Sequence, residues 1–413
     1  MNTKHKLPIT CFDEKKLQGR YRCGNDNELF CYTRINKKEL SQCLDELKKV
    51  GYNIDQELFT NDNSFITLTS CNDLIHITYI SASKTLKVLY DPLCDSKYIS
   101  KSSDHKKITD TTLTIIPLDY SHREIADSNG MAFVITLEDG RFIIIDGGYG
   151  DYVSNGTQKS SNDAKNLYEY LCKNNKRAND EIEIAAWIIT HPHEDHYGAF
   201  VKFSELYSHK VSVEYFIYNQ GDPSTYSKQY PANSFLIDTL PQIIRSRYNN
   251  SKTIKPHVGQ SFTFCGTEIT VLHTHEACIS NFEPTPNDAS LVLRINSNKH
   301  SILLTADCDE TVSTLLVNTF KDYLKSDVLQ INHHGYSGMT KDLFDTVSPK
   351  YTIWTTSQKA FELRTNGKKY EFIGNAVEVN KYIYDKLNEK CIVADGTLKQ
   401  IHLKHNSIKI SKQ

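Results

Sequence analysis

The stretch that decides the fold class is residues 190–198, which read Thr-His-Pro-His-Glu-Asp-His-Tyr-Gly. It directly follows the apolar run at residues 185–189, a pattern that is typical of a buried strand. Histidine nitrogens and carboxylate oxygens are the ligands that Zn²⁺ and similar ions prefer. A strand that ends in such a cluster therefore predicts a metal centre at its carboxyl end.

The spacing of this HxHxDH motif, at residues 191–196, favours two metal ions over one. His191 and His193 lie two residues apart, so in an extended segment both side chains point to the same side and can bind one ion. Asp195 and His196 point away from that pair, towards a second ion. Two ions about 3.5–4 Å apart can share a water and stabilise the attacking and leaving oxygens of a hydrolysis. The motif predicts a dinuclear hydrolase, against the alternative of a histidine-rich surface loop.

Three further apolar runs end in polar residues that would complete such a centre. They are residues 141–148 with Asp146, residues 301–307 with Asp307, and residues 327–335 with His333 and His334. Buried strands with reactive groups at their carboxyl ends are the common layout of layered α/β enzymes. We therefore expect an α/β fold with the site at the ends of these strands.

Five motifs occur in order along the chain. They are Asp146-Gly-Gly148, HxHxDH at 191–196, Asn287-Asp-Ala-Ser-Leu-Val-Leu293, Leu303-Leu-Thr-Ala-Asp307 and His333-His-Gly335. This series resembles the metallo-β-lactamase superfamily, and within it the competence-protein and phosphorylcholine esterase-like subgroup. The resemblance covers roughly residues 113–404 and implies an αββα metallo-β-lactamase sandwich.

The resemblance also implies a role for each matching residue. The first ion would be bound by His191 and His193, the second by Asp195, His196 and His334, with Asp307 as the bridge and Asp146 orienting the metal-binding loop. We prefer His334 to His333 as the ligand because adjacent residues of an extended segment face opposite ways.

Two more roles follow from position near the metal loop. Asp195 and His333 are the candidate catalytic groups, which would relay protons. Tyr336 and Ser337, the next polar residues after the two histidines, are the candidate substrate-binding residues.

The sequence departs from the family pattern at two places. Ala306 stands where a glycine is more usual, a change that we expect to cost nothing. The third histidine of the first metal site is not evident, and His273, His275, Asn287 and Asp288 are the candidates to complete it. We interpret His273 and His275 as ordinary loop histidines, because the subgroup often lacks this ligand.

The resulting function hypothesis is a dinuclear hydrolase of a phosphodiester or phosphoester that uses a metal-bridging hydroxide. The cofactors would be two divalent ions, with Zn²⁺ expected and Mn²⁺ or Fe²⁺ left open. One alternative is hydrolysis of a carboxylic ester, lactone, thioester or β-lactam at the same centre. Another is a metal-bound regulatory or binding protein without catalysis.

The composition limits the partners. The 48 basic and 50 acidic residues give a formal charge of −2, so no positive field favours nucleic acid, and a small-molecule substrate is expected. No apolar stretch approaches the roughly 18 residues needed to cross a membrane. The 11 cysteines form no CxxC pair, and the start has no apolar signal-peptide core, so we expect a cytoplasmic protein.

Patterns outside the motifs predict the domain organisation. Residues 1–95 form a small α+β domain, residues 96–112 a linker, and residues 113–413 the hydrolase domain. In the first domain, Asn36 and Glu39 have capping-box spacing and precede an apolar helix face. This domain would pack, gate the substrate or form a homo-oligomer. Residues 207–262, rich in Tyr, Ser, Asn and Pro, are expected to be a solvated helix face plus a loop, against the alternative of a loop that shapes the substrate pocket.

Overall fold

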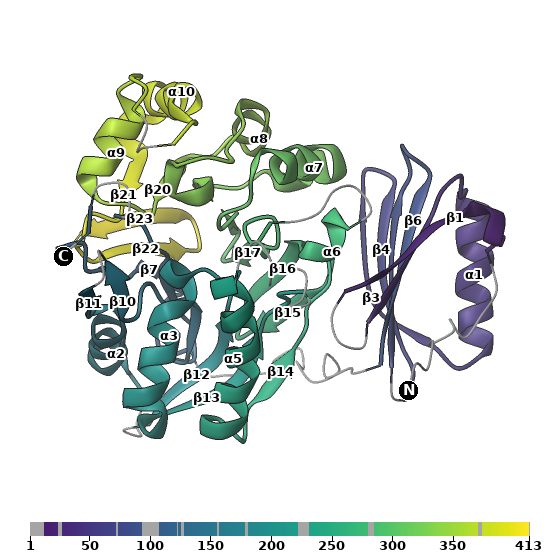
Figure 1. The fold of residues 1–413 in the computed structure, drawn as a ribbon, viewed down its shortest axis with the longest axis horizontal. Coiled ribbons are helices and arrows are strands. Elements are labelled where there is room, and N and C mark those ends of the chain that lie inside the picture. Colours follow the sequence, from purple (N-terminus) through teal and green to yellow (C-terminus); the bar gives the residue numbers. More distant parts are fainter. Residues whose placement is uncertain are drawn as a thin grey trace.

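Two β-sheets pack face to face, and helices cover the outer face of each sheet (Figure 1). The structure is a computed structural model. It describes residues 12–23, 27–71, 73–92, 107–121, 123–124, 128–154, 157–177, 181–221, 231–279, 285–370 and 374–412. The arrangement is an αββα sandwich of the metallo-β-lactamase type, as the sequence predicted.

The first sheet of the sandwich has eight strands. In spatial order they are β14 (Lys252–Ile254), β13 (Val211–Ile217), β12 (Ile182–Ile188), β9 (Phe142–Asp146), β8 (Ala132–Thr136), β7 (Thr112–Ile115), β22 (Lys399–Lys404) and β23 (Ser407–Lys412). The strands from β14 to β9 run parallel, and the remaining pairs are antiparallel. The hairpin of β8 and β9 turns at Glu138-Asp-Gly140, as expected for Asp-Gly between apolar runs.

The second sheet has seven strands. In spatial order they are β15 (Ser261–Phe264), β16 (Thr267–His273), β17 (Val292–Ser297), β18 (His300–Leu304), β19 (Val328–Gln330), β20 (Tyr351–Trp354) and β21 (Cys391–Val393). Strands β18 to β21 run parallel, so their carboxyl ends meet at one edge of the sheet. A separate short hairpin is formed by β10 (Tyr152–Ser154) and β11 (Thr157–Lys159).

Alternating side chains separate the cores of the sandwich. In β9, Ile143 and Ile145 point into the core between the sheets, whereas Phe142 and Ile144 point to the helices outside. The helices on that side are α2 (Asp163–Asn174), α3 (Glu194–Tyr207) and α5 (Pro231–Arg247). The other outer face is covered by α7 (Glu310–Phe320), α8 (Lys341–Val347), α9 (Gln358–Thr365) and α10 (Val377–Leu387), and the short helix α6 (His275–Cys278) follows β16. None of the helices in the described ranges is long and apolar enough to cross a membrane.

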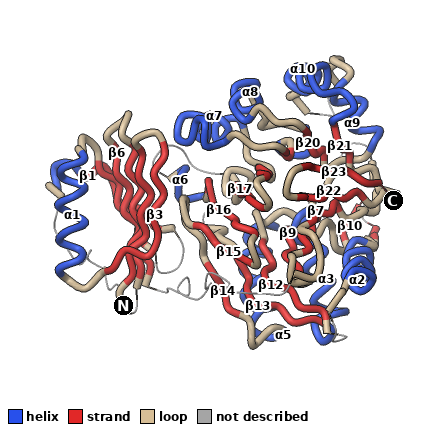
Figure 2. Tube along the Cα trace, turned by 180° about the vertical axis from the view of Figure 1, so that it is seen from behind, coloured by secondary structure: helices blue, strands red, loops and turns tan. Residues whose placement is uncertain are grey.

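Residues before the sandwich form an antiparallel sheet of six strands beside it (Figures 1 and 2). In spatial order they are β1 (Leu17–Arg22), β2 (Glu28–Tyr32), β6 (Thr85–Asp91), β5 (Leu74–Ile80), β4 (Asn63–Thr69) and β3 (Asn53–Thr60). One face of the sheet packs on α1 (Lys37–Lys49), and the other faces the sandwich near α6 and α7. The predicted linker falls largely on residues 93–106, which lie outside the described residues.

Two local details go beyond the sequence predictions. Residues 207–262 contain β13, α5 and β14 as well as loops, and Tyr215 packs on Phe264 in the core. Helix α7 ends at Phe320, where the chain turns into a 3₁₀ segment at Lys321–Leu324. Alternation and helical spacing of apolar residues identified the elements, but not where each one ends.

Helix α1 offers a direct test of the capping-box prediction. The Asn36 side chain accepts hydrogen bonds from the backbone of Lys38 and Glu39, and the Glu39 carboxylate accepts one from the backbone of Asn36. Replacing Asn36 by alanine is expected to lower the free energy of unfolding by about 1 kcal/mol. Urea unfolding measures this, with Lys38→Ala as the control that leaves the cap intact. Equal stability of the two variants would contradict the capping role.

Candidate metal centre

The carboxyl ends of five strands from both sheets meet at one rim of the sandwich. Strands β9 and β12 are parallel neighbours in the first sheet, and β18, β19 and β20 are parallel neighbours in the second. Parallel strands present their carboxyl ends at the same edge, so residues that follow them are brought together. The segments that follow these strands carry every predicted metal ligand.

The HxHxDH motif spans the junction between β12 and α3. His193 is the residue that precedes the first turn of α3, and its imidazole Nδ1 lies 3.1 Å from Nε2 of His191. Asp195 and His196 lie in that first turn and are therefore helical, not extended. The helix start sends these two side chains towards the second sheet, where Asp307 and His334 lie.

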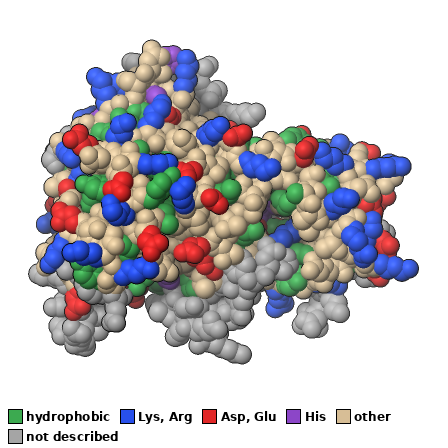
Figure 3. Space-filling view, turned by 90° about the horizontal axis from the view of Figure 1, so that it is seen from above, with side chains coloured by type: hydrophobic (Ala, Val, Ile, Leu, Met, Phe, Trp, Pro, Cys, Tyr) green, Lys and Arg blue, Asp and Glu red, His purple; other side chains and the backbone are tan. Residues whose placement is uncertain are grey.

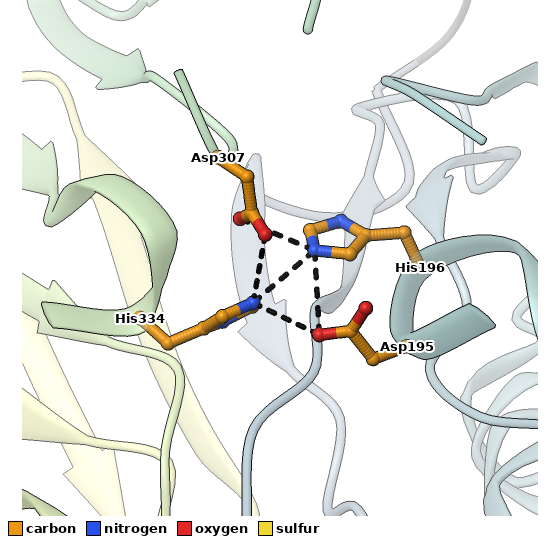
Figure 4. Close-up of side chains that lie close together, drawn as sticks. All are labelled: Asp195, His196, Asp307 and His334. Carbon is orange, nitrogen blue, oxygen red and sulfur yellow. Dashed lines mark hydrogen bonds and ion pairs between the residues drawn. The ribbon is translucent and has the colours of Figure 1, made fainter. Parts of the chain in front are cut away.

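Four of the predicted ligands converge on one point (Figure 4). Nε2 of His334 lies 3.0 Å from Oδ2 of Asp195 and 3.2 Å from Oδ2 of Asp307. Nε2 of His196 lies 3.2 Å from Oδ1 of Asp307 and 3.3 Å from Nε2 of His334. The ligand atoms of these four residues all lie within 4.8 Å of one another, which is the grouping that a cation requires.

A second group of ligand atoms shares one member with the first. His191, His193 and Asp307 also place one atom each within 4.8 Å of one another. Nε2 of His191 lies 3.7 Å from Oδ2 of Asp307. The carboxylate of Asp307 therefore belongs to both groups, as a bridging ligand would.

The ligand atoms of the site are arranged to bind a cation and not to form hydrogen bonds with one another. The two carboxylate oxygens of Asp307 are buried, yet neither makes a well-directed hydrogen bond to a described residue. Nδ1 of His196 contacts Asp146 and Nδ1 of His334 contacts Thr355, at 2.7 and 2.8 Å. When each Nδ1 carries the proton and donates it in a hydrogen bond, Nε2 of the neutral ring has a lone pair. The lone pairs of His196 and His334 then face each other. Paired lone pairs and carboxylates in a buried space are the arrangement that divalent ions satisfy.

The electrostatics of the site are set by burial and by its carboxylates. Burial lowers the pKa of His191 well below its ordinary value, so this ring is neutral. Burial alone would also lower the pKa of His196, but the carboxylates of Asp307 and Asp195 raise it. The same carboxylates raise the pKa of His334. The site thus attracts positive charge to the point where the four ligands meet.

Asp146 holds the HxHxDH loop in place from the end of β9. Its carboxylate accepts hydrogen bonds from the backbone N–H and hydroxyl of Thr190, at 2.8 and 2.7 Å, and from Nδ1 of His196. The backbone of Asp146 is left-handed, with φ of 58°, and its carbonyl accepts a hydrogen bond from the Trp187 indole. One side chain thus fixes both the start of the loop and the ring of a candidate ligand.

Replacing Asp146 by asparagine is expected to lower catalytic turnover by about 10- to 100-fold while the fold is retained. The amide has one oxygen instead of two, so it cannot keep all three hydrogen bonds of the carboxylate. Steady-state kinetics measure the loss, and metal analysis shows whether it follows ion loss. Unchanged turnover would mean that Asp146 does not orient His196.

The turn that carries His333 and His334 differs from the expected extended strand. Residues 332–335 form a tight turn in which both histidines have left-handed backbones, with φ of 45° and 57°. His334 was therefore preferred for a wrong reason, because the alternation of side chains along an extended strand does not apply to this turn. His334 lies in the ligand group because the turn directs its ring inward, while His333 lies at the edge.

Ala306 also has a left-handed backbone, with φ of 48°, directly before Asp307. A non-glycine residue in this region costs roughly 1 kcal/mol. Alanine in place of glycine therefore has a conformational cost, whereas none was expected from the sequence. The strain is offset in part because the Ala306 methyl group lies buried in the core between the sheets.

Of the predicted catalytic and substrate-binding residues, Asp195 belongs to the four-ligand group, whereas His333, Tyr336 and Ser337 lie at its edge. His333 is partly exposed, its Nε2 lies 3.6 Å from Oδ2 of Asp307, and its Nδ1 contacts the Ser337 hydroxyl at 2.7 Å. The rings of His333 and Tyr336 lie 5.4 Å apart. Ser337 thus orients His333, while Tyr336 lies beside it.

The four candidates for a further ligand are placed elsewhere. Nε2 of His273 donates to the backbone carbonyl of Asp288, and Nε2 of His275 donates to that of Cys23, at 2.9 and 3.3 Å. The carboxylate of Asp288 accepts from Thr285, and none of the four, including Asn287, belongs to a metal group among the described residues. His273 and His275 are buried at the ends of secondary structure, not ordinary loop histidines.

Sequence reasoning missed Arg364, which lies in α9 beneath the histidine turn. Its side chain is fully buried, and Nη1 donates to the backbone carbonyl of His334 at 2.9 Å. Nε and Nη2 make no hydrogen bond, and no ion pair joins Arg364 to an acid among the described residues. The guanidinium also lies 5.6 Å from the centre of the Tyr336 ring. No motif surrounds Arg364 in the sequence, so only the structure reveals its place.

The comparisons with known proteins agree with this fold. The family model described as the Metallo-beta-lactamase superfamily matches residues 126–278, the range that contains the HxHxDH motif. The sandwich has the metallo-β-lactamase fold, and its HxHxDH loop lies within the part of the chain that matches this superfamily. A search of curated proteins gave no match.

Three solved structures illustrate the similarity. The metallo-β-lactamase fold protein YhfI from Bacillus subtilis has a TM-score of 0.40 and 12% identity, covering 74% of this chain and 100% of that chain. CmlA, a diiron β-hydroxylase from Streptomyces venezuelae, has a TM-score of 0.38 and 12% identity, covering 76% of this chain and 55% of that chain. Yeast PDE1 has a TM-score of 0.38 and 14% identity, covering 70% of this chain and 99% of that chain. Similarity at this level carries no argument about activity.

Proposed function

We propose that this protein is a dinuclear metal-dependent hydrolase that acts on a phosphodiester or phosphoester. The observation that supports the hydrolase is the membership of Asp307 in both ligand groups. His191 and His193 would hold one ion, and Asp195, His196 and His334 the other. When bound, two such ions lower the pKa of a water and stabilise negative charge on the substrate. Zn²⁺ suits the imidazole and carboxylate ligands best.

The proton-transfer groups in this proposal are His333 and Asp195. Nδ1 of His333 is engaged by Ser337, so its Nε2 is the atom that faces Asp307 and can accept or release a proton. Asp195 is mostly buried beside His334, and its carboxylate would be the second proton acceptor. Tyr336 and Ser337 would contact a small-molecule substrate at the partly exposed edge.

Arg364 supports a phosphate-containing substrate over a carbon ester. A buried guanidinium is costly, and nearby anions compensate its charge; Asp307 is one such anion, and a phosphate group would add a second. Arg364 contacts the backbone of His334 directly, so its charge lies next to the ligand group. Phosphodiesters and phosphomonoesters carry negative charge, whereas carboxylic esters, lactones and thioesters carry none at the reacting group. The competence-protein and phosphorylcholine esterase-like subgroup remains a prediction from the sequence motifs.

Substrate assays test this choice directly. Purified enzyme would be offered bis(p-nitrophenyl) phosphate, p-nitrophenyl phosphorylcholine, a thioester and a chromogenic cephalosporin under the same conditions. We expect the highest kcat/KM on one of the two phosphoesters. Faster turnover of the thioester or the cephalosporin would contradict the substrate class, and normal metal content without any turnover would favour a binding protein.

Replacing Arg364 by methionine is expected to reduce kcat/KM on the preferred phosphoester by about tenfold or more. Methionine keeps much of the apolar volume but removes the charge, and Arg364→Lys serves as the variant that keeps it. Thermal unfolding and metal content of both variants show whether the turn at His334 is intact. Equal losses in the lysine and methionine variants would indicate a packing role instead of a charge role.

A further inference from the structure

The six-stranded sheet has a second face that α1 does not cover. In β6, Leu86 and Val88 pack towards α1, while Lys87 and Leu89 point to the sandwich. The same alternation in β2 turns Leu29 to the sandwich. This second face is partly apolar and partly polar, unlike the face that packs on α1.

Two of the groups of contacts that fix this sheet to the sandwich lie at opposite ends of the space between them. The side-chain amides of Asn61 and Asn63 donate to the backbone carbonyls of Phe320 and Thr319, at 2.7 and 2.8 Å. At the same side the rings of Phe65 and Phe320 stack with their centres 5.2 Å apart. The sheet is therefore held against the carboxyl end of α7.

The other group of contacts centres on Lys87. Its Nζ donates to the backbone carbonyls of Glu276, Ala277 and Ile279, at 3.2, 2.8 and 2.7 Å. An ammonium group has three N–H donors, so all of them are used. Lys87 thus holds the sheet against the end of α6 and has no donor left for another molecule.

Between these two groups of contacts lies a cavity of about 560 Å³. This volume is within the range of sites that hold small molecules, about 300–1,000 Å³. Its wall is mainly apolar and includes Leu29, Cys31, Phe65, Leu89, Val258, Leu272, Leu315 and Leu316. Ala82, Ser83 and Asn318 are exposed lining residues, so they mark where the cavity meets solvent.

The hydrogen-bonding groups of the two charged residues in the cavity wall are already used within the protein. Besides Lys87, whose three donors bind backbone carbonyls, the wall contains Glu276, whose carboxylate accepts a hydrogen bond from Asn219 and contacts Nδ1 of His257, both at 2.9 Å. A charged ligand would lose its hydration without gaining a free hydrogen-bonding group from either residue. The wall therefore favours an uncharged occupant with a hydrocarbon body.

We propose that this cavity binds an uncharged small molecule whose hydrocarbon part lies against Leu89 and Leu272 and whose polar end lies at Ser83. The site is separate from the metal centre and does not depend on the proposed hydrolysis. A medium-length alkyl alcohol represents this ligand class.

The test uses the full-length, metal-loaded protein with Nile red as an uncharged fluorescent probe. We expect saturable binding of one probe per chain and displacement by 1-decanol. Decanoate and decyltrimethylammonium, which carry charges on the same chain, should displace the probe at least tenfold more weakly. No saturable binding, or displacement by the charged compounds as effective as by 1-decanol, would overturn the proposal.

Two variants locate the site. Leu89→Trp should fill the cavity and weaken probe binding at least tenfold, while Phe59→Trp, an exposed position of the same sheet, should leave it unchanged. Should Leu89→Trp not fold, Ser83→Trp at the exposed mouth should still weaken probe binding at least threefold. Probe binding that stays unchanged in every folded cavity variant would overturn the proposal.

Discussion

The Asp307→Asn variant is expected to lose at least about 10³-fold in turnover and to retain fewer metal ions than the unaltered protein. Asp307 is the side chain shared by the two ligand groups, and its buried oxygens have no other hydrogen-bond partner among the described residues. Asparagine has nearly the same shape but lacks the negative charge and one of the two ligand oxygens. Kinetics on the preferred phosphoester and metal analysis of the same sample measure both effects.

Asp327→Asn is the matched control for this substitution. Asp327 lies just before β19, the neighbour of β18, and its partly buried carboxylate pairs with Lys350 and accepts from the backbone of Ser301. This variant makes the same chemical change away from the ligand groups, so it should keep full metal content and turnover. Full turnover in the Asp307→Asn variant would refute the bridging assignment.

Removal of the metal is expected to abolish turnover and to lower the thermal unfolding temperature by several degrees. Ions that bind only the folded state stabilise it by about 4 kcal/mol when their concentration is 1,000 times the dissociation constant. Without ions, Asp195, Asp307 and His334 would remain crowded in a buried space without a cation to neutralise the carboxylates. Differential scanning calorimetry before and after chelation measures the shift.

Restoring the ions separately identifies the natural metal. Zn²⁺, Mn²⁺ and Fe²⁺ would be added to the stripped protein, and the ion that restores both turnover and unfolding temperature is the functional one. A stripped protein that unfolds at the original temperature and remains active would show that the clustered side chains do not serve a metal.

The candidate site was largely predictable from the sequence because its residues directly follow apolar runs. HxHxDH, Asp307 and His334 each come after a strand, and parallel strands bring such positions to one edge. The orientation of the rings was less predictable. Ala306 and His334 have left-handed backbones, and these backbones decide which side chains point inward. The sequence does not predict this, because alanine and histidine normally avoid the left-handed region.

The residues that support the ligands could not be predicted, because their role depends on tertiary contacts. Thr355 follows β20 and contacts His334, while Arg364 reaches the same turn from α9. Neither lies in a motif, and threonine and arginine are common in strands and helices for other reasons. The edge strand β3 has only a weak apolar pattern in the sequence, because exposed residues alternate along it.

Basic and acidic side chains are interspersed on the face shown in Figure 3. A nucleic-acid-binding face usually gathers basic side chains into one patch. The expectation of a small-molecule substrate therefore rests on the chain's balanced charge and on the partly exposed residues beside Asp307.

The central claim is that two ions lie between the sheets at residues 191–196, Asp307 and His334. Elemental analysis by plasma mass spectrometry, on protein purified without chelators, tests it most directly. The account predicts about two equivalents of a divalent transition metal per chain, as expected for a shared carboxylate bridge. Protein that contains no transition metal, yet hydrolyses its substrate, would contradict it.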